Sequence, residues 1–201
     1  MHNFCTINLQ PCSHQHAAFE WTPTNRDQVQ PPAAAVMISD SLCRFVRRCD
    51  DIHIYSRPGL DLQTAYLKIK MGFFKLEKYK ILIIHLGYSD CQQRSKEWNV
   101  QKFLELVNMI RSRCPNLRVA LSSILSRPVD GSEAQDIVIA LNNALRIVCR
   151  KHRVEFLRTY NAIERCHDDC YRAGRHLNSR GNYVVRRFFT ASVKRLKSKP
   201  K

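Results

Sequence analysis

The chain has 201 residues, 44% of them hydrophobic and 25% charged, which is enough for one hydrophobic core and too few to favour two domains. Its 33 lysine and arginine residues outnumber 17 aspartate and glutamate residues, so the formal net charge at pH 7 is +16. The apolar runs are far shorter than the roughly 20 residues of a membrane-spanning helix, and residues 1–10 lack the pattern of a secretory signal. These features argue against a membrane protein and against export, so we expect a soluble intracellular protein.

Residues 1–34 are rich in proline, glutamine, asparagine, histidine and threonine, and they show no helical or strand periodicity. We interpret them as a flexible N-terminal arm that precedes a domain over residues 35–201. In this domain short apolar runs alternate with longer stretches of helical period, a pattern typical of βαβ units and a parallel sheet. The sequence therefore predicts an α/β fold in which helices cover both faces of the sheet, a three-layer α/β/α sandwich.

The predicted elements follow one another in regular order along the chain. Five short runs rich in valine, isoleucine and leucine are expected to be buried strands: Ala34–Ile38, Ile52–Tyr55, Ile81–Leu86, Leu117–Leu121 and Val154–Leu157. The stretches of helical period are Ser41–Cys49, Leu62–Phe74, Lys96–Arg113, Glu133–His152 and a last helix from about Ser179 to Lys197.

The last helix separates into two faces when successive residues are placed 100° apart. The apolar face, which should pack on the sheet, contains Val184, Val185, Phe188, Phe189, Ser192 and Leu196. On the opposite side Arg180, Arg187 and Lys194 recur every seven residues, with Arg186 and Lys197 beside them. The pattern predicts a basic ridge that faces solvent.

The positive charge is concentrated near the C-terminus. Residues 141–201 carry 16 basic and 4 acidic groups, and no aspartate or glutamate follows Asp169. Such a concentration attracts polyanions, because phosphates that are neutralised by lysine and arginine release their counterions. The alternative is an ordinary solvated helix face, but ordinary faces mix charges of both signs. We therefore expect RNA or another nucleic acid as the partner.

The nine cysteines are odd in number and irregular in spacing, which indicates reduced thiols and not a disulfide framework. The segment Cys166-His167-Asp168-Asp169-Cys170 has metal-ligating side chains, but no second Cys/His pair lies at zinc-finger distance from it. We expect neither a metal nor a cofactor.

Four loops that should lie at the carboxyl end of the sheet carry the polar residues of interest. They are Ser39-Asp40-Ser41-Leu42, Arg57-Pro58-Gly59, Gly87-Tyr88-Ser89-Asp90 and Gly174-Arg175-His176-Leu177-Asn178. Together they resemble the SGNH, or GDSL-type, hydrolase family of esterases and lipases. The resemblance implies a flavodoxin-like five-stranded sheet, and it places Ser41 at the family's nucleophile, Gly59 and Ser89 at its oxyanion donors, and His176 at its base.

Three departures from the family's pattern bear on catalysis. Ser89 replaces an asparagine that donates to the oxyanion, and loss of one such donor typically costs about 10²–10³ in rate. Ala173 replaces the aspartate that orients the histidine, a loss that costs about 10⁴ in the serine-protease example. Ser39 replaces a glycine, which would put side-chain bulk at the entrance. Asp168 or Asp169 is an alternative orienting group that would require a bulged loop.

These departures favour structural roles for the remaining residues: Ser41 as the N-cap of the helix that follows it, and His176 as a hydrogen-bonded loop histidine. The segments Ser-Asp-Ser-Leu-Cys, Cys-Asp-Asp-Ile-His-Ile-Tyr and His-Leu-Gly-Tyr-Ser-Asp also resemble the OSK domains of insect germ-plasm proteins. That resemblance implies a non-catalytic module that binds messenger RNA and acts with germ-granule proteins in cytoplasmic ribonucleoprotein granules.

The prediction from the sequence is thus an RNA-binding domain on a degenerate hydrolase fold. Its expected RNA-binding residues are Arg44, Arg47, Arg48, Arg175, Arg180, Arg186, Arg187, Lys194, Arg195 and Lys197. No paired-aromatic RNA-recognition signature is present, so recognition of shape or of single strands is expected. Two alternatives remain: a residual serine esterase that uses Ser41 and His176, and a protein-interaction module with affinity for anionic membranes.

Overall fold

The structure of the chain is a computed structural model that describes residues 33–199 except 45, 47, 48 and 50, and except the side chains of residues 167 and 168. The predicted N-terminal arm therefore lies outside the described residues up to residue 32. Residues 33 and 34 lead directly into the first strand.

Five parallel strands form the central sheet, as predicted. They are β1 (Ala35–Ser39), β2 (Ile52–Ser56), β3 (Ile81–His85), β4 (Arg118–Ser122) and β5 (Glu155–Leu157), and their order in the sheet is β2-β1-β3-β4-β5. This is the flavodoxin-like order. All residues of β1 and β3 are buried, because helices cover both faces of the sheet. The predicted strand positions are confirmed to within one or two residues.

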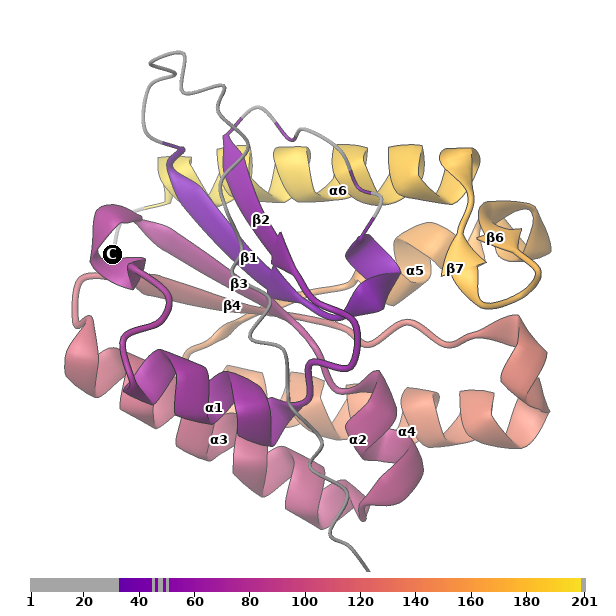
Figure 1. Ribbon diagram of the computed structural model, residues 1–201, viewed down its shortest axis with the longest axis horizontal. Coiled ribbons are helices and arrows are strands. Elements are labelled where there is room, and N and C mark those ends of the chain that lie inside the picture. Colours follow the sequence, from indigo (N-terminus) through magenta and orange to yellow (C-terminus); the bar gives the residue numbers. More distant parts are fainter. Residues whose placement is uncertain (1–32, 45, 47–48, 50, 200–201) are drawn as a thin grey trace, which may run out of the picture. The chain divides into compact units, whose positions relative to one another are not determined.

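Helices lie on both sides of the sheet (Figure 1). On one side are α1 (Leu62–Lys70), α3 (Lys96–Arg113) and α4 (Gly131–Lys151), and on the other is α6 (Ser179–Ser198) with α5 (Thr159–Glu164) packed beside it. The chain moves in one direction across the sheet from β2 to β5, so right-handed crossovers place α1, α3 and α4 on the same side. The predicted three-layer α/β/α architecture is confirmed.

The last helix packs as its periodicity predicts. Val185, Phe189 and Leu196 of α6 are each at most 1% exposed, and Ser192 is also buried. Val184 and Phe188 are half-buried at the border of this face. The basic residues at positions 180, 187 and 194 are all exposed, so the sequence correctly separated the two faces.

The helix predicted over Ser41–Cys49 is wrong for its described residues. Only a single 3₁₀ turn, η1 (Ser41–Cys43), follows β1, and Cys49 already forms an isolated antiparallel bridge with Ile52. Leu42, Cys43, Val46 and Cys49 are buried, which explains the helix-like apolar spacing. The described apolar residues between β1 and β2 therefore pack into the core without forming a regular α-helix.

The sequence also missed several short elements. Two are α2 (Tyr88–Gln93) and the antiparallel hairpin of β6 (Tyr171–Arg172) and β7 (His176–Leu177). The remaining 3₁₀ turns are η2 (Leu76–Lys78), η3 (Pro128–Asp130) and η4 (His167–Cys170). These elements are too short for periodicity to be detected, and two of them border the candidate site. No helix among the described residues has both the length and the apolarity to cross a membrane.

Candidate functional site

The structure brings the loops singled out in the sequence to the carboxyl edge of the sheet. Ser41 follows β1, Gly59 lies three residues beyond the end of β2, and Ser89 lies in α2, just after β3. Because β1 lies between β2 and β3, these positions flank the point where the strand order reverses. His176 belongs to β7, which packs against η1 and so against the turn that begins at Ser41. Among the described residues, however, no hydrogen bond joins Ser41 to His176.

Asp40, and not Ser41, caps the turn after β1. The Oδ1 atom of Asp40 accepts a hydrogen bond from the backbone N–H of Leu42 at 2.9 Å. Burial of this carboxyl group raises its pKa to about 6, because desolvation disfavours the charged form. The predicted N-cap role of Ser41 is therefore wrong: Ser41 is the first residue inside the turn, and Asp40 already supplies the acceptor.

The expectation that Ser39 obstructs the entrance is also wrong. Ser39 is fully buried, and its hydroxyl group donates to the carbonyl of Asp40 at 3.1 Å. Its side chain points into the protein and leaves the surface of the loop unaltered.

His176 lies in a hairpin whose turn consists of two left-handed residues. Ala173 has φ 49° and Gly174 has φ 65°, and the N–H of Arg175 donates to the carbonyl of Arg172 at 3.2 Å. Two left-handed central residues and this bond are typical of a type I′ turn, and the pairing of Arg172 with His176 leaves residues 173–175 as the connection between the strands. The turn packs against η3, because the N–H of Val129 donates to the carbonyl of Gly174 at 3.2 Å.

The Nδ1 atom of His176 is buried and has no hydrogen-bond partner among the described residues. The prediction of a satisfied histidine is therefore wrong on this side of the ring. Asp169, one of the two alternative orienting groups, pairs with Arg180 instead, at 3.1 Å between Oδ2 and Nη1. The side chain of Asp168 lies outside the described residues. The ring nitrogen that an aspartate at position 173 would orient thus has no partner among the side chains that the structure describes.

Ser89 is exposed on α2, while its neighbour Asp90 is buried. The Oδ2 atom of Asp90 accepts from the N–H of Leu62 at 3.1 Å, so this carboxylate ties α2 to the start of α1. Burial raises the pKa of Asp90, and the bond from Leu62 opposes that rise. Asp90 therefore has a structural role here, and Ser89 is the residue that α2 presents to solvent.

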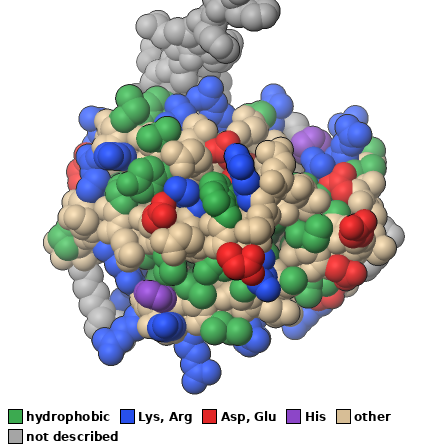
Figure 2. Space-filling model, turned by 90° about the horizontal axis from the view of Figure 1, so that it is seen from below, with side chains coloured by type: hydrophobic (Ala, Val, Ile, Leu, Met, Phe, Trp, Pro, Cys, Tyr) green, Lys and Arg blue, Asp and Glu red, His purple; other side chains and the backbone are tan. Residues whose placement is uncertain are grey.

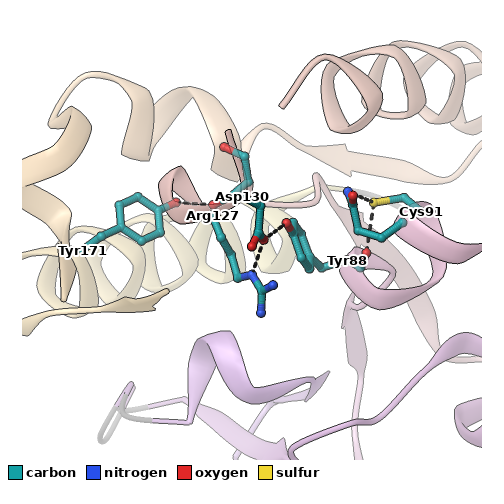
Figure 3. A network of polar contacts seen from close by, with 7 residues as sticks. Tyr88, Cys91, Arg127, Asp130 and Tyr171 are labelled. Carbon is teal, nitrogen blue, oxygen red and sulfur yellow. Dashed lines mark hydrogen bonds and ion pairs between the residues drawn. The ribbon is translucent and has the colours of Figure 1, made fainter. Parts of the chain in front are cut away.

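A polar network that the sequence did not reveal lies beside this edge (Figure 3). The hydroxyl of Tyr88 donates to Asp130, the Nε atom of Arg127 lies 2.6 Å from the same carboxylate oxygen, and the guanidinium lies 4.5 Å from the Tyr88 ring centroid. The bond from Arg127 lowers the pKa of Asp130. The network holds η3 against α2 and keeps Tyr88 at 5% exposure, so the Tyr88 side chain is not presented at the surface of its loop.

The basic ridge of α6 is partly neutralised by acidic residues from elsewhere in the chain. Arg180 pairs with Asp169, as described above. The Nη1 atom of Arg195 lies 3.5 Å from Oε2 of Glu155, and the Nζ atom of Lys197 lies 2.6 Å from Oδ2 of Asp51. These acidic residues precede their basic partners by 11 to 146 residues in the sequence, so the absence of acidic residues after Asp169 concealed them.

Four of the other predicted RNA-binding residues are not paired in this way within the described part of the chain. Arg175, Arg186, Arg187 and Lys194 are exposed and form no ion pair with a carboxylate in the part of the chain that the structure describes. Arg44 is exposed, and Arg47 and Arg48 lie outside the described residues. The side of the molecule formed by α1, α3 and α4 shows basic and acidic side chains interspersed with apolar ones (Figure 2).

Within the described residues no group of three or more histidine, cysteine, aspartate or glutamate side chains is arranged to hold a metal ion. Neither Cys166 nor Cys170 forms a disulfide, and no other described cysteine does.

No family model matches the sequence, and no curated protein is significantly similar to it. Solved structures, in contrast, match closely in fold. A GDSL-like lipase from Bacteroides thetaiotaomicron superimposes with a TM-score of 0.69 at 12% identity, covering 81% of this chain and 88% of the lipase. A lipolytic protein of the G-D-S-L family from Veillonella parvula superimposes with a TM-score of 0.67 at 13% identity, covering 80% of this chain and 98% of its own.

A lipase/acylhydrolase from Enterococcus faecalis gives a TM-score of 0.65 at 14% identity and covers 83% of this chain and 98% of its own. The identities are too low to carry an activity from one protein to another. The agreement extends over nearly the whole length of each neighbour, and the sheet order is the same as that implied by the loop motifs. The chain therefore has the α/β sandwich fold of the SGNH, or GDSL-type, hydrolases.

Proposed function

We propose that this domain binds RNA through the outer surface of α6 and the adjoining β6–β7 hairpin, and that it does not act as an ester hydrolase. The observation that carries the proposal is a set of exposed cations on these two elements without a carboxylate partner in the described part of the chain: Arg172, Arg175, Arg186, Arg187 and Lys194. Such cations make phosphate contacts that provide affinity for any polynucleotide.

The state of the former catalytic positions supports the second half of the proposal. Ser41 has no hydrogen bond to His176, and no carboxylate among the described side chains is bonded to the Nδ1 atom of His176 to orient the ring. Ser89 offers a hydroxyl where the related hydrolases use an amide. A serine nucleophile acts efficiently only when a histidine base is hydrogen-bonded to it and a third group orients that histidine.

Binding of fluorescein-labelled single-stranded RNA, followed by fluorescence anisotropy at several salt concentrations, tests the proposal. The double substitution Arg187→Glu with Lys194→Glu should weaken binding and lower the slope of log K against log salt by about 1.4, since each lost phosphate contact on a single strand contributes about 0.7. The matched control is Arg146→Glu with Arg150→Glu. It makes the same change in net charge on α4, on the opposite side of the sheet.

An equal loss of affinity in both double variants would show that only the net charge matters, and it would remove α6 as the binding surface. Stronger binding to vesicles of anionic lipid than to RNA would favour a membrane-associated module instead.

A residual esterase is the second candidate, and one observation favours it: β7 packs on η1, which places the strand of His176 beside the turn of Ser41. Hydrolysis of p-nitrophenyl acetate by the wild type and by Ser41→Ala separates the two functions. Under the RNA-binding proposal the rates are equal, and the substitution leaves RNA affinity unchanged. Activity that disappears in Ser41→Ala would establish the esterase.

The proposal extends to the biological setting through the sequence resemblance to the C-terminal domain of the insect germ-plasm protein Oskar. We propose that the RNA is messenger RNA, bound in its 3′ untranslated regions, and that the domain acts with germ-granule proteins in cytoplasmic ribonucleoprotein granules. Crosslinking in intact cells followed by sequencing of the bound RNA tests this part. Recovery of ribosomal or transfer RNA without messenger RNA would contradict it.

A further inference from the structure

A cleft of about 760 Å³ is lined by residues of the β6–β7 hairpin and of the first two turns of α6. Figure 1 shows the hairpin at the end of α6 where β7 leads into the helix. One wall is a single helix face formed by Ser179, Asn182, Tyr183 and Arg186, which are spaced three or four residues apart. The hairpin forms the other wall. Ser41, Gly59 and Ser89 do not line this hairpin cleft, but His176 and Ala173 do, so the cleft adjoins the former catalytic positions on the hairpin side only. Its volume lies in the range of ligand sites, about 300–1,000 Å³.

Three arginines line the hairpin cleft and give it a positive charge. Arg172 and Arg175 extend from the hairpin and Arg186 from α6, and all three are exposed. None of them forms an ion pair with a described carboxylate, in contrast to Arg180, which is paired with Asp169. Guanidinium groups around a cleft bind phosphate oxygens through bidentate hydrogen bonds. The cleft is therefore suited to an anionic ligand.

An aromatic side chain stands at the same place. Tyr183 is 57% exposed although it belongs to a well-packed helix, so its ring contributes little to the core. The guanidinium of Arg187 lies 5.7 Å from the ring centroid and donates to the tyrosine hydroxyl at 3.3 Å. An exposed ring with cations nearby is the arrangement on which an unpaired base stacks while its phosphates are neutralised.

Two residues of the cleft wall, His176 and Asn182, each have a buried polar atom without a hydrogen-bond partner among the described residues. The Nδ1 atom of His176 and the Oδ1 atom of Asn182 are covered by protein and have no partner in the described part of the chain. The Nδ2 atom of Asn182 donates to the carbonyl of Leu177 at 3.1 Å, which fixes the orientation of the amide and leaves an acceptor unpaired. Unpaired buried polar atoms are rare and destabilising, about 1–3 kcal/mol each. A ligand with a hydrogen-bond donor would satisfy this acceptor after a small movement of the hairpin.

We propose that the hairpin cleft binds one nucleotide of single-stranded RNA, with the base stacked on Tyr183 and the phosphate held by Arg172, Arg175 and Arg186. This inference rests on the proposed RNA-binding function and makes it specific. A duplex cannot present an unpaired base to Tyr183, so the cleft selects single strands. The outer surface of α6 contributes charge without this selection.

The experiment compares the affinity of the full chain for a labelled RNA of eight uridines and for a blunt-ended RNA duplex. Tyr183→Ala should weaken single-strand binding roughly tenfold or more, the usual effect of losing one stacking ring, and leave duplex binding unchanged. Tyr183→Phe should retain single-strand binding, because the ring remains. Phe73→Ala is the matched control, since Phe73 is similarly exposed, at 61%, and follows α1 on the other side of the sheet. It should leave both affinities unchanged.

Arg175→Glu and Arg186→Glu should also weaken single-strand binding, and each should lower the salt slope by about 0.7. Ultraviolet crosslinking of the uridine octamer should map to Tyr183. If Tyr183→Ala binds single-stranded RNA as tightly as the wild type, the cleft proposal is wrong. The RNA-binding function proposed for α6 would still stand in that case if Arg187→Glu with Lys194→Glu loses RNA binding. Absence of RNA binding by the wild-type chain would overturn both. Displacement of the octamer by a phosphopeptide that lacks any base, at equal concentration, would assign the cleft to a different class of ligand.

Discussion

His85 and Asp40 are buried side chains whose protonation changes in opposite directions on folding. His85 is 2% exposed, its Nδ1 atom lies 2.8 Å from the hydroxyl of Ser122, and burial lowers its pKa to about 4. Burial raises the pKa of Asp40 to about 6. The unfolded chain therefore binds a proton at His85 between about pH 6.5 and 4, while the folded chain binds one at Asp40 between about pH 6 and 4.

The two effects on stability should nearly cancel in the wild-type protein. The stabilising contribution of neutral His85 to the free energy of unfolding is lost as the pH falls from 6.5 through 4. The stabilising contribution of protonated Asp40 is lost as the pH rises from about 4 through 6. In Asp40→Asn only the histidine effect remains. We expect the free energy of unfolding of this variant to fall by up to about 3 kcal/mol between pH 6.5 and 4, at about 1.4 kcal/mol per pKa unit.

Urea unfolding at pH 4, 5, 6 and 7 measures this difference. His85→Gln is the reciprocal variant, since it removes the histidine titration and should become more stable as the pH falls from 6 to 4. A wild-type curve and an Asp40→Asn curve of the same shape would show that Asp40 is charged in the folded protein at pH 5.

Ser89 and Ala173 stand where the SGNH family that the sequence resembles would have an oxyanion-donating asparagine and an orienting aspartate. We expect the double substitution Ser89→Asn with Ala173→Asp to raise hydrolysis of p-nitrophenyl acetate at least tenfold, because it restores an oxyanion donor and an orienting carboxylate. Adding Ser41→Ala should abolish the gain. If the double variant is as inactive as the wild type, Ser41 and His176 are too far out of alignment for these two changes to be sufficient.

At the scale of elements, the β6–β7 hairpin stores strain in its turn. Ala173 has φ 49°, a left-handed conformation that a non-glycine residue adopts at a cost of about 1 kcal/mol or more. Asparagine tolerates this conformation and is favoured at this position of a type I′ turn. Ala173→Asn should therefore raise the free energy of unfolding by about 0.5–1 kcal/mol, as measured by urea denaturation.

Gly174 is the control for this prediction, because a Cβ atom there would lie 2.8 Å from the backbone nitrogen of Val129. Gly174→Ala should destabilise the protein. A destabilised Ala173→Asn variant would indicate that the side chain at position 173 is restricted by contacts and not by its backbone conformation.

Phe189 anchors α6 to the sheet and is fully buried, with its ring centroid 5.8 Å from that of His85. Phe189→Ala should lower the free energy of unfolding by about 3–5 kcal/mol, the usual cost of removing a buried phenylalanine ring. Arg187→Ala on the solvent side of the same helix should change it by less than about 0.5 kcal/mol. Thermal unfolding of both variants compares the two faces directly. Similar losses would contradict the assignment of α6 to one buried and one exposed face.

Long helices were predicted from the sequence more accurately than short elements. The helix predicted over Lys96–Arg113 has those bounds in the structure, because it is long, strongly periodic and ended by residues before Pro115. The helix predicted over Ser41–Cys49 failed, because burial of a turn produces the same apolar spacing as a short amphipathic helix. The hairpin that carries His176 has two residues in each strand, which is too few for an alternating pattern to appear.

At the scale of the whole molecule, the net charge of +16 should govern how fast the protein meets a polyanion. Long-range attraction accelerates association by about 10–10³, and salt screens it. We expect the association rate constant for single-stranded RNA to fall at least tenfold between low and moderate ionic strength, while the dissociation rate changes less. Stopped-flow anisotropy measures both rates. An association rate that does not depend on salt would rule out electrostatic attraction as the source of the encounter.

The sequence by itself determined the layers of this protein and the two faces of α6. Both follow from periodicity and burial, which act over a few neighbouring residues: period two or continuous apolar runs for strands, and a period of 3.6 for helices. The positions Ser41, Gly59, Ser89 and His176 were proposed from the resemblance of their loop motifs to a hydrolase family, and their roles stay predictions.

Only the tertiary structure decided which of these groups are paired. Glu155 and Asp51 neutralise cations of α6 from distant parts of the chain, Arg127 and Asp130 fix Tyr88, and the Nδ1 atom of His176 remains without a partner in the described residues. The hairpin cleft exists because two short strands fold back against the start of α6. Ion pairs, unmade hydrogen bonds and cavities depend on contacts between residues far apart in sequence, for which local periodicity contains no information.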